Sequence, residues 1–292
     1  MKPIFLFATL FFTNILFAQT TTEFTTFWNN YSQFNAGATG IEHKHYVSNT
    51  TRLQYFYSSL GGVPMRANLS VATNIENIKG AIGLNVDLDK YGITRTQKIT
   101  PSYAYQRDFG DGKTLGAGLG IALIRVSNKY SQLNQNHPDD PVFLEQDKVE
   151  WFADVNCGLM YRSDHLLAGV GIVNIRQAFS NNKFSHFQYY LNAGYRIDIG
   201  EKVEVIPSVL FGNPLSNNFS DIDINLMTKL ADFLLLGINY NHNQSISGTI
   251  GFEVMNKIRL AYTSESNSQI GRSSFLFNKH EIALSVRIDQ NN

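Results

Sequence analysis

From about residue 48 onward, apolar side chains recur at every second position, in successive segments of roughly ten residues. In the segment 282–288, isoleucine, leucine and valine alternate with alanine, serine and arginine, and the segments 82–89 and 248–254 alternate in the same way. A period of two places one kind of side chain on each face of a β-strand. The pattern therefore predicts strands with one apolar and one polar face.

The alternating segments follow one another almost to the end of the chain. The segment 187–199 is long for a strand of a soluble protein and suits a tilted strand that crosses a membrane. We predict an all-β protein, a transmembrane antiparallel β-barrel of about 14 strands. The predicted strands are 48–58, 63–75, 79–90, 93–108, 113–127, 150–162, 165–175, 186–199, 202–212, 219–230, 232–242, 244–255, 257–265 and 279–289.

The lengths of the connections support a barrel independently. Bacterial outer-membrane barrels combine short periplasmic turns with longer outer loops. If the first strand starts in the periplasm, every predicted periplasmic turn is short: these turns lie near 76–78, 109–112, 163–164, 200–201, 231 and 256. The longest connections, near 128–149, 176–185 and 266–278, then all lie outside.

The first eighteen residues contain a lysine at position 2, an apolar run and the small residue Ala18. This arrangement is typical of a cleaved signal peptide. A membrane anchor helix is the alternative, but the run is shorter than the ~20 apolar residues that a bilayer span requires. We predict a signal peptide at 1–18, a periplasmic N-terminal segment at 19–47 and one barrel domain at 48–289, surrounded by outer-membrane lipid.

Composition excludes some partners and leaves one alternative fold. Lys and Arg number 24, as do Asp and Glu, and neither sign forms a run, so we expect no nucleic-acid partner. The single cysteine, Cys157, excludes an internal disulfide framework. A soluble β-sandwich would also show alternating strands, but the leader, the strand lengths and the tyrosines near strand ends favour the barrel.

The sequence contains no recognisable catalytic motif, so we predict that the protein is not an enzyme and has no cofactor. His43 and His45 share a strand face and are candidate metal ligands, although a pair without a third ligand is more often solvated. Asp139 and Asp140, between two prolines, are either calcium ligands or, more simply, part of a rigid surface turn. Polar strand faces, with Asp87 as an example, are predicted to line the lumen.

Several short elements resemble the PorP/SprF family of type IX secretion system membrane proteins. Residues 35–40 correspond to the family's Asn-Pro-Ala-x-x-Gly element, with Ala36 in place of the usual proline, and 52–55 correspond to its Arg-x-Gln-aromatic element. Gly-x-Pro at 62–64 and the closing His-Glu element near 280–284 also match. The family-motif positions are Asn35, Gly40, Arg52, Gln54, Pro64, His280 and Glu281.

The resemblance implies an outer-membrane component of the type IX secretion and gliding apparatus. Such a protein is a non-enzymatic platform that exports, or retains at the surface, a partner with a C-terminal sorting domain, together with other secretion components. We expect the outer loop 128–149 to engage the partner. The alternatives are a passive porin or hydrophobic-solute channel and, with less support, an outer-membrane enzyme.

Overall fold

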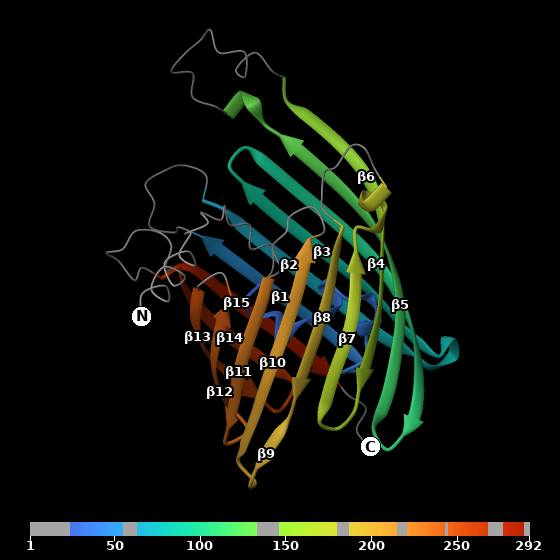
Figure 1. Cartoon of the computed structure of the whole chain (residues 1–292), viewed down its shortest axis with the longest axis vertical. Coiled ribbons are helices and arrows are strands. Elements are labelled where there is room, and N and C mark those ends of the chain that lie inside the picture. The colour runs from blue at the N-terminus through green and yellow to red at the C-terminus, as the bar shows by residue number, and fades with distance from the viewer. Residues whose placement is uncertain are drawn as a thin grey trace, which may run out of the picture.

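The computed structural model describes residues 24–54, 63–132, 146–179, 187–214, 221–242, 245–267 and 277–288. Its strands form one antiparallel sheet that closes into a barrel, because β1 (His45–Gln54) pairs with β15 (Phe277–Ile288) (Figure 1). The other strands are β2 (Met65–Ile75), β3 (Gly80–Tyr91), β4 (Thr94–Gly110), β5 (Lys113–Asn128), β6 (Lys148–Arg162), β7 (Leu166–Val173), β8 (Gln188–Tyr195), β9 (Ile197–Ile199), β10 (Val203–Pro214), β11 (Asp221–Leu230), β12 (Leu234–Asn241), β13 (Ser245–Val254) and β14 (Ile258–Asn267).

The predicted barrel of about 14 strands is confirmed. β8 and β9 both pair with β10 and are separated only by Arg196. They therefore count as one interrupted strand, so the described part of the chain forms a closed barrel of 14 strands. β1 begins at His45, slightly before the predicted start at residue 48.

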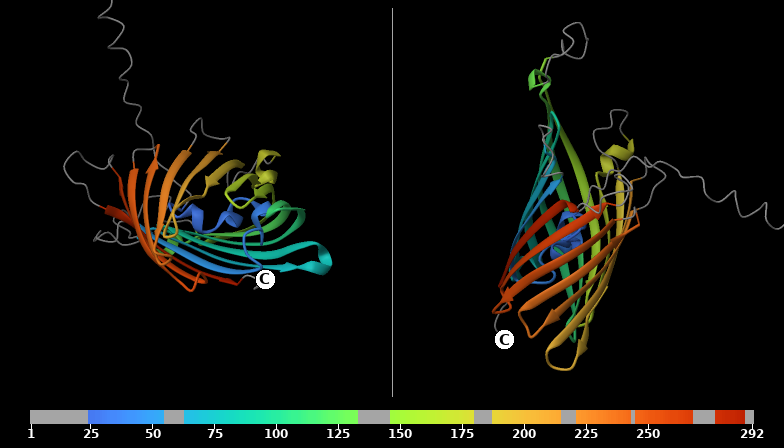
Figure 2. Two further views of the ribbon diagram at one scale, coloured as in Figure 1. Left: turned by 90° about the horizontal axis from the view of Figure 1, so that it is seen from below. Right: turned by 90° about the vertical axis from the view of Figure 1, so that its left-hand side faces the viewer.

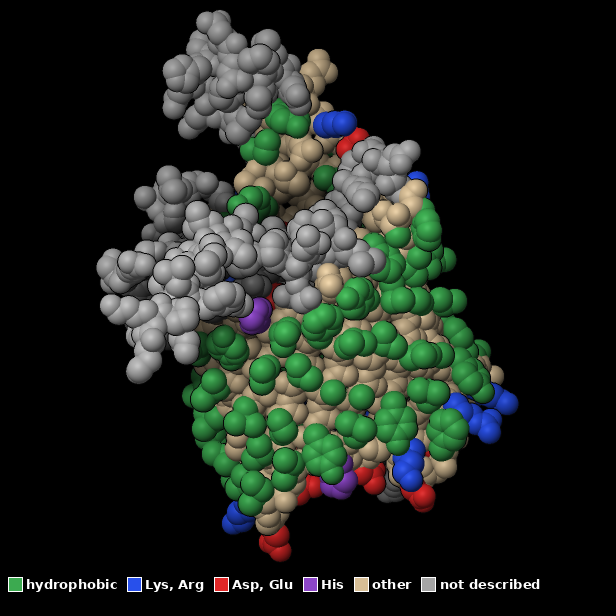
Figure 3. All heavy atoms as spheres, in the orientation of Figure 1, with side chains coloured by type: hydrophobic (Ala, Val, Ile, Leu, Met, Phe, Trp, Pro, Cys, Tyr) green, Lys and Arg blue, Asp and Glu red, His purple; other side chains and the backbone are tan. Residues whose placement is uncertain are grey.

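Side chains alternate between the two faces of the barrel wall. Along β13, buried and exposed residues alternate without interruption: Ile246 and Ile250 are exposed, whereas Ser247 and Thr249 are buried. Polar side chains thus face inward and apolar side chains face outward, the reverse of a soluble sandwich. Figure 3 shows the apolar side chains spread over the outside of the barrel.

No helix in the described part of the chain is both long enough and apolar enough to cross a membrane.

The two ends of the barrel differ in the way that the sequence predicts. At one end, Ala231 and Asp232 both have positive φ, as do Met255 and Asn256, the conformation of two-residue hairpin turns. The connections that follow β5, β7 and β14 lie at the other end. We call these ends the short-turn end and the long-loop end; in bacterial outer-membrane barrels they face the periplasm and the exterior, respectively.

The longest strands are neighbours. β4, β5 and β6 contain 17, 16 and 15 residues, and β6 pairs with β7 only from Cys157 to Arg162. The first half of β6 therefore continues beyond the end of β7. Figure 1 shows these strands reaching above the rest of the barrel at the long-loop end.

Candidate functional site

The polypeptide that precedes the first strand lies inside the barrel. It forms three short 3₁₀ turns, η2 (Phe27–Asn29), η3 (Tyr31–Gln33) and η4 (Ala36–Ala38). Figure 2 shows this segment, in dark blue, within the ring of strands. We call residues 24–44 the plug.

The plug crosses the lumen from one end to the other. Thr25 contacts Glu265 and Glu281, which lie toward the long-loop ends of β14 and β15, whereas Lys44 pairs with Glu76, next to the β2–β3 turn, at 3.1 Å. The described part of the segment 19–47, expected on the periplasmic side, therefore lies within the lumen, with only its last residues at the short-turn end.

An apolar core joins the plug to the barrel wall. Phe27, Tyr31 and Phe34 are buried and stack on one another edge to face, with ring centroids 6.4 and 5.9 Å apart. Phe34 also contacts Tyr190 on β8, at 5.3 Å between ring centroids. Burial of three aromatic side chains, at about 1.5–3 kcal/mol each, stabilises the plug in place.

A buried ionic network fixes the beginning of the plug. The Glu281 carboxylate accepts hydrogen bonds from the backbone N–H groups of Thr25 and Thr26, at 2.9 and 3.0 Å, and from the Thr26 hydroxyl at 2.8 Å. The same carboxylate forms an ion pair with Arg52 Nε on β1. Both charged side chains are at most 3% exposed, so Glu281 depends on Arg52 for charge compensation.

A second carboxylate extends this network. Glu265 accepts from the Thr25 hydroxyl at 2.8 Å, lies 3.4 Å from Arg52 Nη2 and binds Lys279 Nζ at 2.6 Å. We call Arg52, Glu265, Lys279 and Glu281 the lock, because together they hold the first plug residues against β1, β14 and β15.

The middle of the plug packs closely against Gly116 and Gly118 of β5, which we call the glycine floor. A Cβ added to Gly118 of β5 would lie 2.1 Å from the Ala36 carbonyl oxygen, and one added to Gly116 would lie 2.3 Å from that of Gly37. Such distances are far shorter than any real Cβ contact, so only glycine lets the plug backbone approach the wall this closely.

Asn35 positions this turn. Its side-chain oxygen accepts from the Gly37 N–H at 2.9 Å, and its amide nitrogen donates to the Leu159 carbonyl at 3.0 Å. The first bond caps η4, and the second ties the turn to β6. Asn35 is fully buried, which accounts for asparagine at this motif position.

The remaining motif positions have separate roles. Gly40 has a φ of +65°, and a Cβ there would lie 2.4 Å from the Ala81 Cβ, so this bend requires glycine. The Gln54 N–H donates to the Pro64 carbonyl at 3.0 Å, continuing the β1–β2 ladder. His280 faces outward and shares a 2.7 Å hydrogen bond with the Tyr262 hydroxyl.

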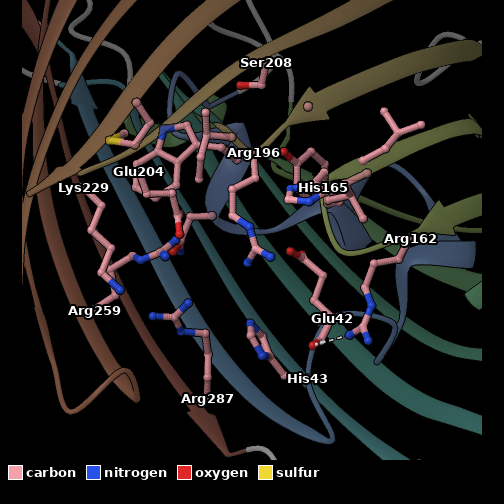
Figure 4. A pocket seen from close by; sticks show the side chains of 18 of the residues that line it. Glu42, His43, Arg162, His165, Arg196, Glu204, Ser208, Lys229, Arg259 and Arg287 are labelled. Carbon is pink, nitrogen blue, oxygen red and sulfur yellow. Dashed lines mark hydrogen bonds between the residues drawn. The ribbon is translucent and has the colours of Figure 1, made fainter. Parts of the chain in front are cut away.

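Below the plug, a cavity of about 390 Å³ extends to the short-turn end. We call it the vestibule. Figure 4 shows the guanidinium groups of Arg196, Arg259 and Arg287 directed into it. Its charged lining residues are Glu42, Arg162, Asp164, Arg196, Glu204, Lys229, Arg259 and Arg287, together with His43 and His165.

The base of the long loop is organised. The Ser131 N–H and hydroxyl donate to the Asp147 carboxylate at 3.0 and 3.1 Å. The backbone bond from Ser131 holds the pKa of Asp147 below its ordinary value. Arg125 lies over the Trp151 ring, 5.9 Å from its centroid, and joins β5 to β6 just below the loop. The loop tip, 133–145, lies outside the described residues.

Of the two candidate metal sites, the structure describes the residues of only one, His43 and His45. His43 stacks on Tyr46, and His45 Nδ1 shares a 2.7 Å hydrogen bond with the Thr73 hydroxyl. Within the described ranges, no cluster of three or more His, Cys, Asp or Glu residues is arranged to hold a metal ion. Asp139 and Asp140 lie outside those ranges, so their calcium interpretation stays a prediction.

Two solved structures have the same fold as this chain. The CymD monoaromatic hydrocarbon channel aligns with a TM-score of 0.50 and 9% identity, over 90% of this chain and 94% of CymD. The Ralstonia pickettii toluene transporter TbuX aligns with a TM-score of 0.50 and 11% identity, over 87% of this chain and 92% of TbuX. At these identities the likeness shows the fold alone.

A search among curated proteins finds no match to this chain. The sequence profile of the type IX secretion system membrane protein PorP/SprF, in contrast, matches residues 16–286, nearly the whole length. The matched region includes the plug, the lock, the glycine floor and almost all of the barrel wall. The chain therefore belongs to the PorP/SprF family of type IX secretion system membrane proteins.

Proposed function

We propose that this outer-membrane barrel is a non-enzymatic platform of the type IX secretion and gliding system. It supports the export or surface anchoring of a partner protein that carries a C-terminal sorting domain, and it works with other components of the system. The chain reaches the outer membrane through a cleaved signal peptide at 1–18, and lipid surrounds its apolar outer face.

Family membership combined with an occupied lumen carries this proposal. The plug is held by the lock, by the aromatic core and by Asn35, which contact strands on different sides of the barrel. A barrel whose interior is filled in this way presents its ends, rather than a pore, to other molecules. We infer that the partner binds at the long-loop end.

The loop 128–149 is the proposed contact with the partner. It stands on β5 and β6, which extend beyond β7, and the Ser131–Asp147 hydrogen bonds close its base. Both ends of the loop are therefore held in place, so binding of a partner does not have to order the loop base.

Deletion of 130–147 tests this assignment. Barrel insertion is checked by heat-modifiable migration on gels, and a deletion of 268–276, in another outer connection, serves as control. We expect loss of partner display at the cell surface only for the first deletion. Unchanged display in cells that carry the inserted Δ130–147 barrel would refute the loop assignment.

A hydrophobic-solute channel is the second candidate. CymD and TbuX, which share the fold, are described as a monoaromatic hydrocarbon channel and a toluene transporter. The vestibule gives a solute room on one side of the plug. Its charged lining is unsuited to an apolar solute, and passage would require the plug to move, so we favour the platform.

A further inference from the structure

We propose that the vestibule is a binding site for a short acidic peptide segment of a periplasmic protein. The site lies at the opposite end of the barrel from loop 128–149. The vestibule is therefore separate from the proposed contact with the exported partner.

Three cations of the vestibule share a single carboxylate. Glu253 binds Lys229 Nζ at 2.8 Å, Arg259 Nε at 2.8 Å and also Arg287. The Glu253 side chain is 3% exposed, so it is fully used within this cluster. Three positive charges around one negative charge leave an excess of positive charge in this cluster, in surroundings where solvent screens charges less than in bulk water.

Arg196 adds a cation that is open to the cavity. Its side chain is 43% exposed, and its nearest carboxylate partner, Asp198, is 3.9 Å away. Arg162, at the end of β6, donates to the backbone carbonyls of Ile41 and Glu42 at 3.0 and 2.9 Å. Both acceptors are uncharged carbonyl groups, so these two bonds do not neutralise the guanidinium group.

Acidic residues also line the vestibule and limit where an anion fits. Glu42, Asp164 and Glu204 are the acids among its lining residues. Asp164 lies over the β4–β5 turn, where a Cβ on Gly112 would be 2.1 Å from its carboxylate oxygen. Glu204 lies opposite Lys229 in the β10–β11 register, whereas Asp198 is too far from Arg196 Nε for a hydrogen bond, so the favoured place for a negative charge is beside Arg196.

Buried polar atoms on the lining lack protein partners. Both side-chain amide atoms of Asn225 and the hydroxyl oxygens of Ser208 and Ser285 have no hydrogen-bond partner within the described part of the chain, and the same holds for Arg196 Nε. Asn225 and Ser285 are each 1% exposed. Buried polar groups normally have partners, so unpartnered donors and acceptors on residues that line one cavity point to a polar occupant.

The volume of the vestibule and the apolar residues in its lining favour a peptide segment as the ligand. The volume of about 390 Å³ lies in the range of ligand pockets, on the order of 300–1,000 Å³. Trp28, Met227 and Leu235 provide apolar contacts beside the charges. The barrel wall separates this cavity from lipid, whereas its opening at the short-turn end faces the periplasm. An acidic chain segment meets each of these conditions.

The test measures fluorescence anisotropy of fluorescein-labelled tetraglutamate with the full-length protein in neutral detergent at low salt. Labelled tetraglutamine is the control probe. We expect binding of tetraglutamate alone, weakened about tenfold by Arg196→Gln, which removes a charged hydrogen-bond donor. Arg107→Gln, on the outer face near the same end of the barrel, should leave binding unchanged.

A second variant and a competitor complete the test. Asn225→Leu keeps the side-chain size, removes the unpartnered amide and should weaken binding severalfold, with heat-modifiable migration confirming that the barrel is folded. Equal binding of both probes, or equal binding by wild type and Arg196→Gln, would overturn the site. Displacement by equimolar inorganic phosphate would overturn the assignment to a peptide and indicate a small-anion site.

Discussion

Arg52 on the first strand and Glu281 on the last lie directly opposite each other in the β1–β15 register, at the seam that closes the barrel. The same Glu281 binds the backbone of Thr25 and Thr26 at the start of the plug. A single buried ion pair thus joins barrel closure to plug retention. This relationship gives a structural reason for both family-motif positions.

Substitution Arg52→Ala should destabilise the protein, because it leaves Glu281 buried without its cation. Breaking a buried pair in this way costs about 3–5 kcal/mol. Urea unfolding in detergent, followed by tryptophan fluorescence, measures the change. Arg107→Ala is the control, since that side chain is exposed. A loss for Arg52→Ala no larger than for the control would show that the lock contributes little.

Substitution Gly118→Ala should displace the plug, because its Cβ would lie 2.1 Å from the Ala36 carbonyl oxygen. Overpacking of this kind costs about 1–3 kcal/mol. The matched control is Gly248→Ala on β13, where a Cβ meets nothing within 4 Å. We expect protease cleavage within residues 24–44 to become faster only in the first variant. Equal cleavage rates in both variants would contradict the close contact.

The loop base should depend on pH through Asp147. Because Ser131 holds the pKa of Asp147 below its ordinary value of about 3.9, the ionised form is favoured in the folded state. The stabilisation is therefore present above pH ~4 and is lost as the pH falls through the folded pKa. At pH 7, Ser131→Ala and Asp147→Asn should both speed proteolysis of the loop. Cleavage that is unchanged in both variants would show that the hydrogen bonds do not restrain the loop.

The plug should keep ion conductance low. In planar bilayers we expect the wild-type barrel to show little conductance, and the double variant Arg52→Ala/Glu281→Ala to show open events as the plug loosens. Steady wild-type conductance that the double variant leaves unchanged would favour the channel.

The barrel wall was predictable from the sequence, since alternation along segments such as 282–288 reflects the two faces of each strand directly. The plug was not, because residues 24–44 form short 3₁₀ turns whose contacts are with distant strands. One signal was present: Arg52, Glu265 and Glu281 are charged residues within predicted membrane strands, where a buried charge requires a partner. The vestibule was not predictable either, because its lining comes from separate strands, turns and the plug.

The family resemblance identified Asn35, Gly40, Arg52 and Glu281 without explaining them. Each has a role only once the plug lies in the lumen: Asn35 caps η4, Gly40 provides a bend with positive φ, and Arg52 pairs with Glu281. Such roles depend on contacts between residues as far apart as 25 and 281, which periodicity does not reveal.

The most direct test of the platform is an affinity pull-down of the tagged protein from detergent-solubilised outer membranes, with bound proteins identified by mass spectrometry. The Δ130–147 barrel serves as the matched control. We expect the wild type to recover a secreted protein with a C-terminal sorting domain, and the deletion variant to lose it. Recovery of the barrel alone, from membranes in which such proteins are present, would contradict the platform.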